Sequence, residues 1–176
     1  MANCVNYGCS SLSEHIQVSC DGFLGGIANI IVLNCDHSIT DPSDAIEVQA
    51  AIDAGEAVVV SGVKVGMDAA SAIEVESLVS CQPPKTINYD RSLSFIDESV
   101  EDNVGFFNEL FAGRAFGGVI LHLCDADKVV WVDDAVSFQG SVIIPNDNTE
   151  LIRAEGIGKW KSKTNPLIYD TPAGIF

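Results

Sequence analysis

A ten-residue segment in the middle of the chain, Thr86–Phe95, has the alternation of apolar and polar side chains that is typical of a strand. One face carries Ile87, Tyr89, Leu93 and Phe95, and the other carries Thr86, Asn88, Asp90, Ser92 and Ser94. Because successive side chains of a strand point to opposite faces, this segment is expected to have one face in the core and one in solvent. Half-buried strands are typical of antiparallel sheets.

Short apolar segments separated by turn residues recur along the rest of the chain. Further strands are expected at 27–33, 57–65, 72–79, 118–124, 129–132, 135–144 and 150–157. Two helices are expected, at 41–55 and 102–112, with Asp41 and Asp102 as candidate caps and a glycine at the end of each. The pattern predicts a β-rich α+β fold: an antiparallel β-sandwich or barrel with one or two short flanking helices.

The 176 residues suit a single domain, because no internal repeat or linker divides them. Within this domain, residues 1–35 form a segment rich in Cys, Gly, Ser and Asn. Residues 158–176 contain Pro166, Pro172 and Gly174, which favours an extended C-terminal arm.

The strands expected at 57–65 and 72–79 flank the loop 66–71, which predicts a long hairpin with an exposed apolar tip. Such a tip is either an aggregation hazard or an element of assembly. Val63, Val65 and Met67 are therefore candidate interface residues. On this interpretation, Val63→Asp or Val65→Asp should block assembly and leave the subunit folded.

The charge is strongly acidic, with 9 Lys+Arg against 25 Asp+Glu and a net charge of −16. This balance argues against tight binding to nucleic acid or to anionic lipid. Residues 151–176 nevertheless carry four basic and two acidic side chains, a balance of +2, which leaves −18 for the other 150 residues. A basic end on an acidic body suits contact between copies, with Lys159, Trp160, Lys161 and Lys163 as candidate contacts. The alternative is a solvated basic tail.

No local signature predicts catalysis, so we expect no enzyme and no cofactor. Ser10, Ser11 and Ser13 lie near His15, but without the Gly-x-Ser-x-Gly pattern of a nucleophile elbow. The pairs Asp125/Asp127 and Asp133/Asp134 are the carboxylates closest to a Ca²⁺ or Mg²⁺ pattern, and local turn hydrogen bonding explains them better. His122, within an apolar run, is expected to be a hydrogen-bonded core or interface residue.

Four of the six cysteines fall in the first 35 residues, at positions Cys4, Cys9, Cys20 and Cys35. No Cys-x-x-Cys pair is present, so reduced thiols that pack as small apolar residues are expected. A zinc site in this segment is the alternative. The first residues lack the features of a signal peptide, and no segment is apolar over the length of a membrane span, so we expect a soluble chain.

From Lys85 onward, the order of the segments is distinctive. The Tyr-Asp-Arg-Ser-Leu-Ser-Phe strand leads into a short aromatic helix, 104–113, and then into the aliphatic strand Val119-Ile-Leu-His-Leu. A turn at Asp125-Ala-Asp-Lys, the segment Trp131-Val-Asp-Asp-Ala, a further strand and an Asn-rich turn before Glu150-Leu-Ile-Arg follow. This order resembles the tail tube proteins of tailed bacteriophages and of contractile injection systems.

The resemblance implies a virion structural protein, made in the host cytoplasm, that binds copies of itself and other tail proteins. In that family, small β-sandwich or barrel subunits stack as hexameric rings, and a long hairpin and terminal arms bridge subunits. The lumen is acidic, so that DNA passes without specific binding during ejection. The alternatives are another virion component (a head-tail connector, tail terminator or capsid decoration protein), a small metal- or ligand-binding β-domain, and a hydrolase.

Overall fold

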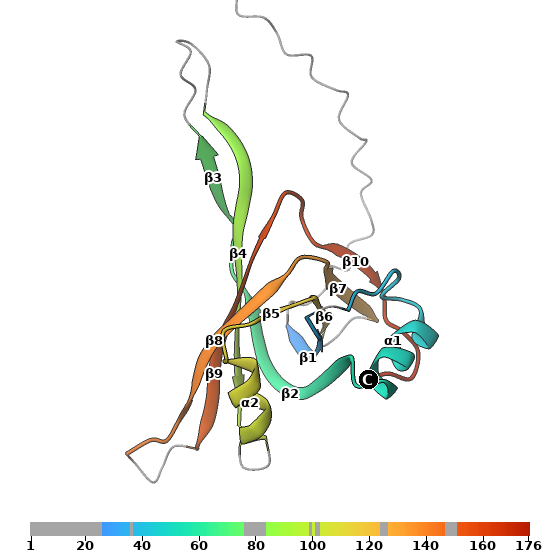
Figure 1. Ribbon diagram of the computed structural model, residues 1–176, viewed down its shortest axis with the longest axis vertical. Helices are drawn as coiled ribbons and strands as arrows, with labels where there is room; N and C mark the ends of the chain where they lie inside the picture. The colour runs from blue at the N-terminus through green and yellow to red at the C-terminus, as the bar shows by residue number, and fades with distance from the viewer. Residues whose placement is uncertain are drawn as a thin grey trace, which may run out of the picture.

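One antiparallel sheet dominates the computed structural model, which describes residues 26–35, 37–75, 84–98, 100, 103–123, 127–146 and 151–176. In these ranges the sheet has ten strands, in the order β10-β7-β6-β1-β2-β4-β9-β8-β5, with β3 paired to β4 (Figure 1). The strands are β1 (Ile27–Leu33), β2 (Ala57–Met67), β3 (Ser71–Val75), β4 (Lys85–Asp97), β5 (Ala115–Phe116), β6 (Gly118–Leu123), β7 (Lys128–Val132), β8 (Val136–Ile143), β9 (Arg153–Ser162) and β10 (Leu167–Asp170). The helices are α1 (Ala45–Asp53) and α2 (Val104–Leu110).

The predicted β-rich α+β class with short helices is confirmed, and the sheet is a single open one. Its two halves share β2, which pairs with β1 from Ala57 to Ser61 and, beyond a register shift, at Val65, and which pairs with β4 from Lys64 to Met67. The chain also connects the halves at Gly117, the single residue between β5, which pairs with β8, and β6, which pairs with β1. The sheet therefore bends around its core without closing into a barrel.

The main core lies between the two halves and contains side chains from both, together with Phe107 and Leu110 of α2. A group of phenylalanines packs within it, with the rings of Phe95 and Phe138 6.0 Å apart. The strands leave room for these rings through glycines, because a Cβ at Gly156 would lie 2.5 Å from the Phe95 ring and one at Gly158 2.8 Å from the Phe138 ring. Glycine in these strands is thus a packing requirement.

Helix α1 covers the outer face of the β1–β6–β7 half, where Val48 and Ala51 pack against Ile31, Ile120 and Trp131. Strands β1, β6 and β7 therefore have no exposed residue on either face. The outer face of β4, β9 and β8 has no helix over it, and Ser94, Lys159 and Gln139 are exposed there. No helix among the residues described is long and apolar enough to cross a membrane.

Several element boundaries differ from those expected. The N-cap of α1 is Asp44, whose carboxylate accepts a hydrogen bond from the Ile46 N–H at 2.9 Å, and not Asp41. The expected cap of α2, Asp102, lies outside the described residues, as does the segment 1–25.

The extended arm expected at 158–176 is instead part of the folded body. Residues 158–162 complete β9, and β10 pairs with β7 from Leu167 to Asp170. The final residue, Phe176, stacks on His122 with ring centroids 4.4 Å apart, and His122 also shares a 3.0 Å hydrogen bond with Asn29. The predicted hydrogen-bonded role of His122 is confirmed.

Candidate assembly surface

A two-stranded arm formed by β3 and the first part of β4 extends away from the body (Figure 1). Residues Ser71 to Val75 pair with Asp90 to Lys85, and a register shift leaves Ile87 as an extra residue in β4. The prediction that 57–65 and 72–79 pair with each other as a hairpin is therefore wrong. Strands β2 and β3 follow one another along the same edge of β4, and the chain reverses between β3 and β4.

The link between β2 and β3 explains why the chain does not turn back at 66–71. The backbone N–H of Asp68 donates to the Ser92 carbonyl oxygen at 3.0 Å, and the Ser92 hydroxyl donates to the Asp68 carboxylate at 2.8 Å. The local sequence favours a hairpin loop at Asp68, and these bonds instead keep the chain alongside β4.

The arm has almost no core of its own. Within it, Val75 is 51% exposed and Ile87 49% exposed, and Met67 at its base is 37% exposed. An isolated two-stranded ribbon is only marginally stable in water. The outer edge of β3 also has no pairing partner among the described strands. An exposed apolar ribbon with a free edge is suited to adding a strand from another molecule.

Of the residues expected at an assembly interface, three are buried in the core. Val63 is 4% exposed, Val65 9% and Trp160 4%, and all three pack in the cluster between the sheet halves. The prediction that they are exposed at a hairpin tip or a basic end is wrong for these three residues, because each lies on the inward face of its strand. Lys159, Lys161, Lys163 and Met67 are exposed, as expected.

Lys159, Trp160 and Lys161 lie on β9, where they pair with residues of the neighbouring strand β4. They line a groove of about 840 Å³ between the base of the arm and the start of β8. The other lining residues are Ala69, Ser71, Asp90, Arg91, Ser92, Asp134, Ala135 and Ser137. Lys163 and Met67 lie outside this groove.

A second apolar surface lies at the opposite end of the molecule from the arm, where the hairpin of β8 and β9 projects (Figure 1). Ile144 is 73% exposed, Leu151 64% and Ile152 48%. The Asn-rich turn was predicted here from the sequence, but the projection of the hairpin beyond the core was not. Exposed apolar side chains that lie close together are candidate contact sites for another molecule.

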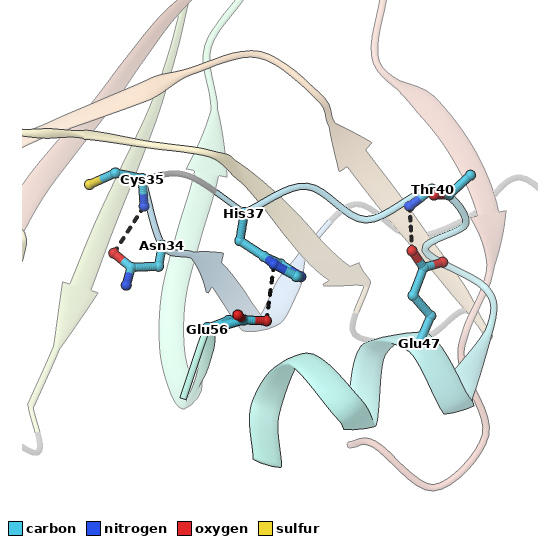
Figure 2. A network of polar contacts seen from close by, with 6 residues as sticks. All are labelled: Asn34, Cys35, His37, Thr40, Glu47 and Glu56. Carbon is cyan, nitrogen blue, oxygen red and sulfur yellow. Dashed lines mark hydrogen bonds and ion pairs between the residues drawn. The ribbon is translucent and has the colours of Figure 1, made fainter. Parts of the chain in front are cut away.

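Polar side chains around α1 include the pair of residues closest to a catalytic arrangement (Figure 2). His37 Nδ1 lies 3.1 Å from Glu56 Oε2, and Cys35 is two residues from His37. A cysteine nucleophile needs its base within hydrogen-bond reach. Figure 2 shows the Cys35 sulfur pointing away from the imidazole, so these three residues do not form a catalytic arrangement in this conformation.

Glu47, also drawn in Figure 2, has a structural role. Glu47 accepts hydrogen bonds from the backbone N–H groups of Thr40, at 2.7 Å, and Asp41, at 3.0 Å. These two donors hold the pKa of Glu47 below its ordinary value of 4.5. The carboxylate thereby fixes the loop 37–44 against the first turn of α1.

Replacing Glu47 with Gln should lower the free energy of unfolding at neutral pH by about 0.5 kcal/mol, a small figure because solvent screens this carboxylate. Since folding lowers the Glu47 pKa, its contribution is present above pH 4.5 and is lost as the pH falls through the folded pKa. Chemical unfolding of both proteins from pH 7 to pH 3 tests this. A difference that stays constant below pH 4 would contradict the assigned role.

No cluster of three or more His, Cys, Asp or Glu side chains is present in the ranges that the structure describes. Cys4, Cys9 and Cys20 lie outside these ranges, so the zinc alternative stays a prediction. Cys35 is an exposed free thiol, contrary to the expected buried position. Asp133 and Asp134 lie between β7 and β8, and Asp125 is outside the described residues.

Comparison of the chain with protein-family models, with curated proteins and with solved structures gives no match.

Proposed function

We propose that this chain is a self-assembling virion structural protein of the tail tube type, whose copies form rings that stack into a tube for DNA. The observation that carries the proposal is the projecting arm of β3 and β4, which has exposed apolar side chains and a free edge. A marginally stable ribbon of this kind gains stability when a neighbouring subunit adds strands to it. Closure of a ring removes the free edges of its subunits.

Two further features support assembly. The hairpin of β8 and β9 presents Ile144, Leu151 and Ile152 at the end opposite the arm, where the next ring would lie. The net charge of −16 provides the carboxylates that repel DNA phosphates from a channel wall.

Negative-stain electron microscopy of the purified protein, at low and high salt and over a range of concentrations, tests the proposal. Rings or hollow tubes are the expected result. Closed shells, or decoration of a separate capsid lattice, would favour another virion component. Stoichiometric zinc in metal-free buffer would favour the metal-binding β-domain and count against the tube.

The arm should be required for assembly and dispensable for folding. The double variant Val75→Lys/Ile87→Lys should keep its melting temperature, since both side chains are about half exposed, and should form no rings. The control Val58→Lys changes a side chain that is 44% exposed on β2, away from the arm, and should assemble normally. If the double variant forms rings in the same yield as the wild type, the arm is not required for assembly.

A further inference from the structure

The free edge of β3 continues the edge along which β2 pairs with β1. Strands β2 and β3 follow one another along one edge of β4, and β1 lies on the opposite side of β2 from β4. Strand β1 begins at Ile27, which is opposite Val65, and β2 continues past that point to Met67 and then to β3. Because β1 and β2 are antiparallel, the outer edge of β3 is in line with β1 and lies beyond its first residue.

The same register, extended backwards from Ile27, specifies which residues would pair with β3. Regular antiparallel pairing would place residue 25 opposite Met67. From Met67 to Ser71 the chain advances four residues, whereas their partners on β4, Leu93 and Asp90, are three residues apart. A strand on the other side that passes this one extra residue in the same way would form three pairs with β3. These are Gly22 with Ser71, Cys20 with Ile73, and Val18 with Val75.

The sequence ahead of β1 has the side-chain alternation of a strand. Its apolar residues fall at alternate positions, Leu12, Ile16, Val18 and Cys20, with Glu14 as the exception, and the residues between them are Ser13, His15, Gln17 and Ser19. In β3, Ile73 and Val75 lie on one face of the strand. The extended register brings Cys20 and Val18 beside these two side chains, whereas a shift of one residue in either direction would bring polar side chains there. The register and the alternation are independent observations, and they select the same pairing.

The stability of the arm also calls for a further strand. A two-stranded ribbon is marginally stable in water, and three strands with an apolar face are needed for independent stability. Within β3, Ile73 is partly shielded from solvent and the other four residues are exposed. A third strand would pair with the backbone N–H and C=O groups on the outer edge of β3 and would cover Ile73 and Val75.

We propose that residues 18–22 of the same chain pair with the outer edge of β3 and form the third strand of the arm. Val18 then contacts Val75, and Cys20 contacts Ile73, on one face of this three-stranded sheet. The inference goes beyond the proposed function, since it concerns the fold of a single subunit. The new strand has a free outer edge of its own, so a neighbouring subunit can still add strands to the arm.

A disulfide tests the register. In the variant Ile73→Cys, the new thiol should form a disulfide with the native Cys20 on oxidation. Residues directly opposite one another in an antiparallel pair have Cα atoms about 4.5–5.5 Å apart, which a disulfide spans. Mass spectrometry of the peptides identifies the bond, and a non-reducing gel gives the size of the product. The control Ala72→Cys carries its thiol on the opposite face of β3 and should leave Cys20 as a free thiol.

The gel also identifies the source of the strand. A bond within one chain migrates as a monomer, as the inference requires. A disulfide-linked dimer would show that a second copy supplies the strand, and would overturn the assignment to the same chain. The inference is equally overturned if Cys20 stays unbonded in an Ile73→Cys protein that keeps the wild-type melting temperature.

Hydrogen exchange tests the pairing without any change to β3, and so does not depend on how the cysteine variant folds. In the variant Val18→Pro/Cys20→Pro, two backbone N–H groups of the proposed strand are removed. The β3 amides that point away from β4 should then exchange about 10-fold or more faster than in the wild type. The control Val5→Pro lies outside residues 18–22 and should exchange like the wild type. Equal exchange in the double variant and the wild type would overturn the inference.

Neither measurement requires rings or tubes, so the inference and the proposed function fail separately. If Cys20 bonds to position 73 within one chain and electron microscopy shows neither rings nor tubes, the third strand stands and the tube proposal fails. If the wild type forms rings but the bond does not form, the tube proposal stands and the third strand is overturned.

Discussion

The substitution Gly117→Ala should lower the free energy of unfolding by about 3–5 kcal/mol, one of the largest effects expected from a single methyl group in this chain. A Cβ at this position would lie 2.1 Å from the His37 carbonyl oxygen and 2.7 Å from that of Asn34. Both are backbone atoms, and the Gly117 N–H donates to the carbonyl oxygens of Leu33 and Asn34 at 3.1 and 3.2 Å. The methyl group therefore forces apart the junction that joins the two halves of the sheet.

Chemical denaturation of the variant beside Gly105→Ala checks this expectation. Gly105 lies in α2, and a Cβ added there would meet nothing within 4 Å, so alanine should stabilise the protein by about 0.5–1 kcal/mol through helix propensity. If Gly117→Ala unfolds within about 1 kcal/mol of the wild type, the loop at 34–37 yields easily and the junction is not a fixed point of the fold.

Val63→Asp should unfold the subunit, with a loss of about 4 kcal/mol or more, because a carboxylate would enter the main core at a position that is 4% exposed. This reverses the expectation from the sequence that the variant stays folded and only fails to assemble. Circular dichroism and thermal unfolding of the purified variant measure the effect.

Met67→Asp is the matched comparison, since it lies on the same strand and is 37% exposed. It should keep the fold, with a loss of about 0.5 kcal/mol. A Val63→Asp protein with a native melting transition would show that the valine side chain is not held in the core, and would restore Val63 as a candidate interface residue.

Most strands could be predicted from the sequence, because local patterns carry that information. The apolar run Ile27–Leu33 is β1 with the same limits, and Leu93 and Phe95 lie on the buried face of β4 as expected. Strand β10 could not be predicted, because Pro166 and Pro172 flank a short segment whose pairing with β7 is remote in sequence. The pairing of β2 and β3 with β4 also depends on remote contacts, and the Asp68–Ser92 bonds replace the turn that local chemistry favours.

For the assembly surface, the sequence contains a signal that corrects the prediction. Val63 and Val65 flank Lys64, and Lys159 and Lys161 flank Trp160. Period-two alternation places the valines and the tryptophan on one face and the lysines on the other, which is what the structure shows. The groove itself could not be predicted, since its walls come from four separate segments.

Strand β4 has a mechanical consequence for any assembly held by the arm. Its first residues form the arm, while the residues from Tyr89 to Asp97 pair with β9 inside the body. A pull on the arm along the strand loads this whole ladder of hydrogen bonds in shear, at the same time. A particle built from such subunits would distribute tension through continuous strands, and its weakest points under load would be the contacts between copies.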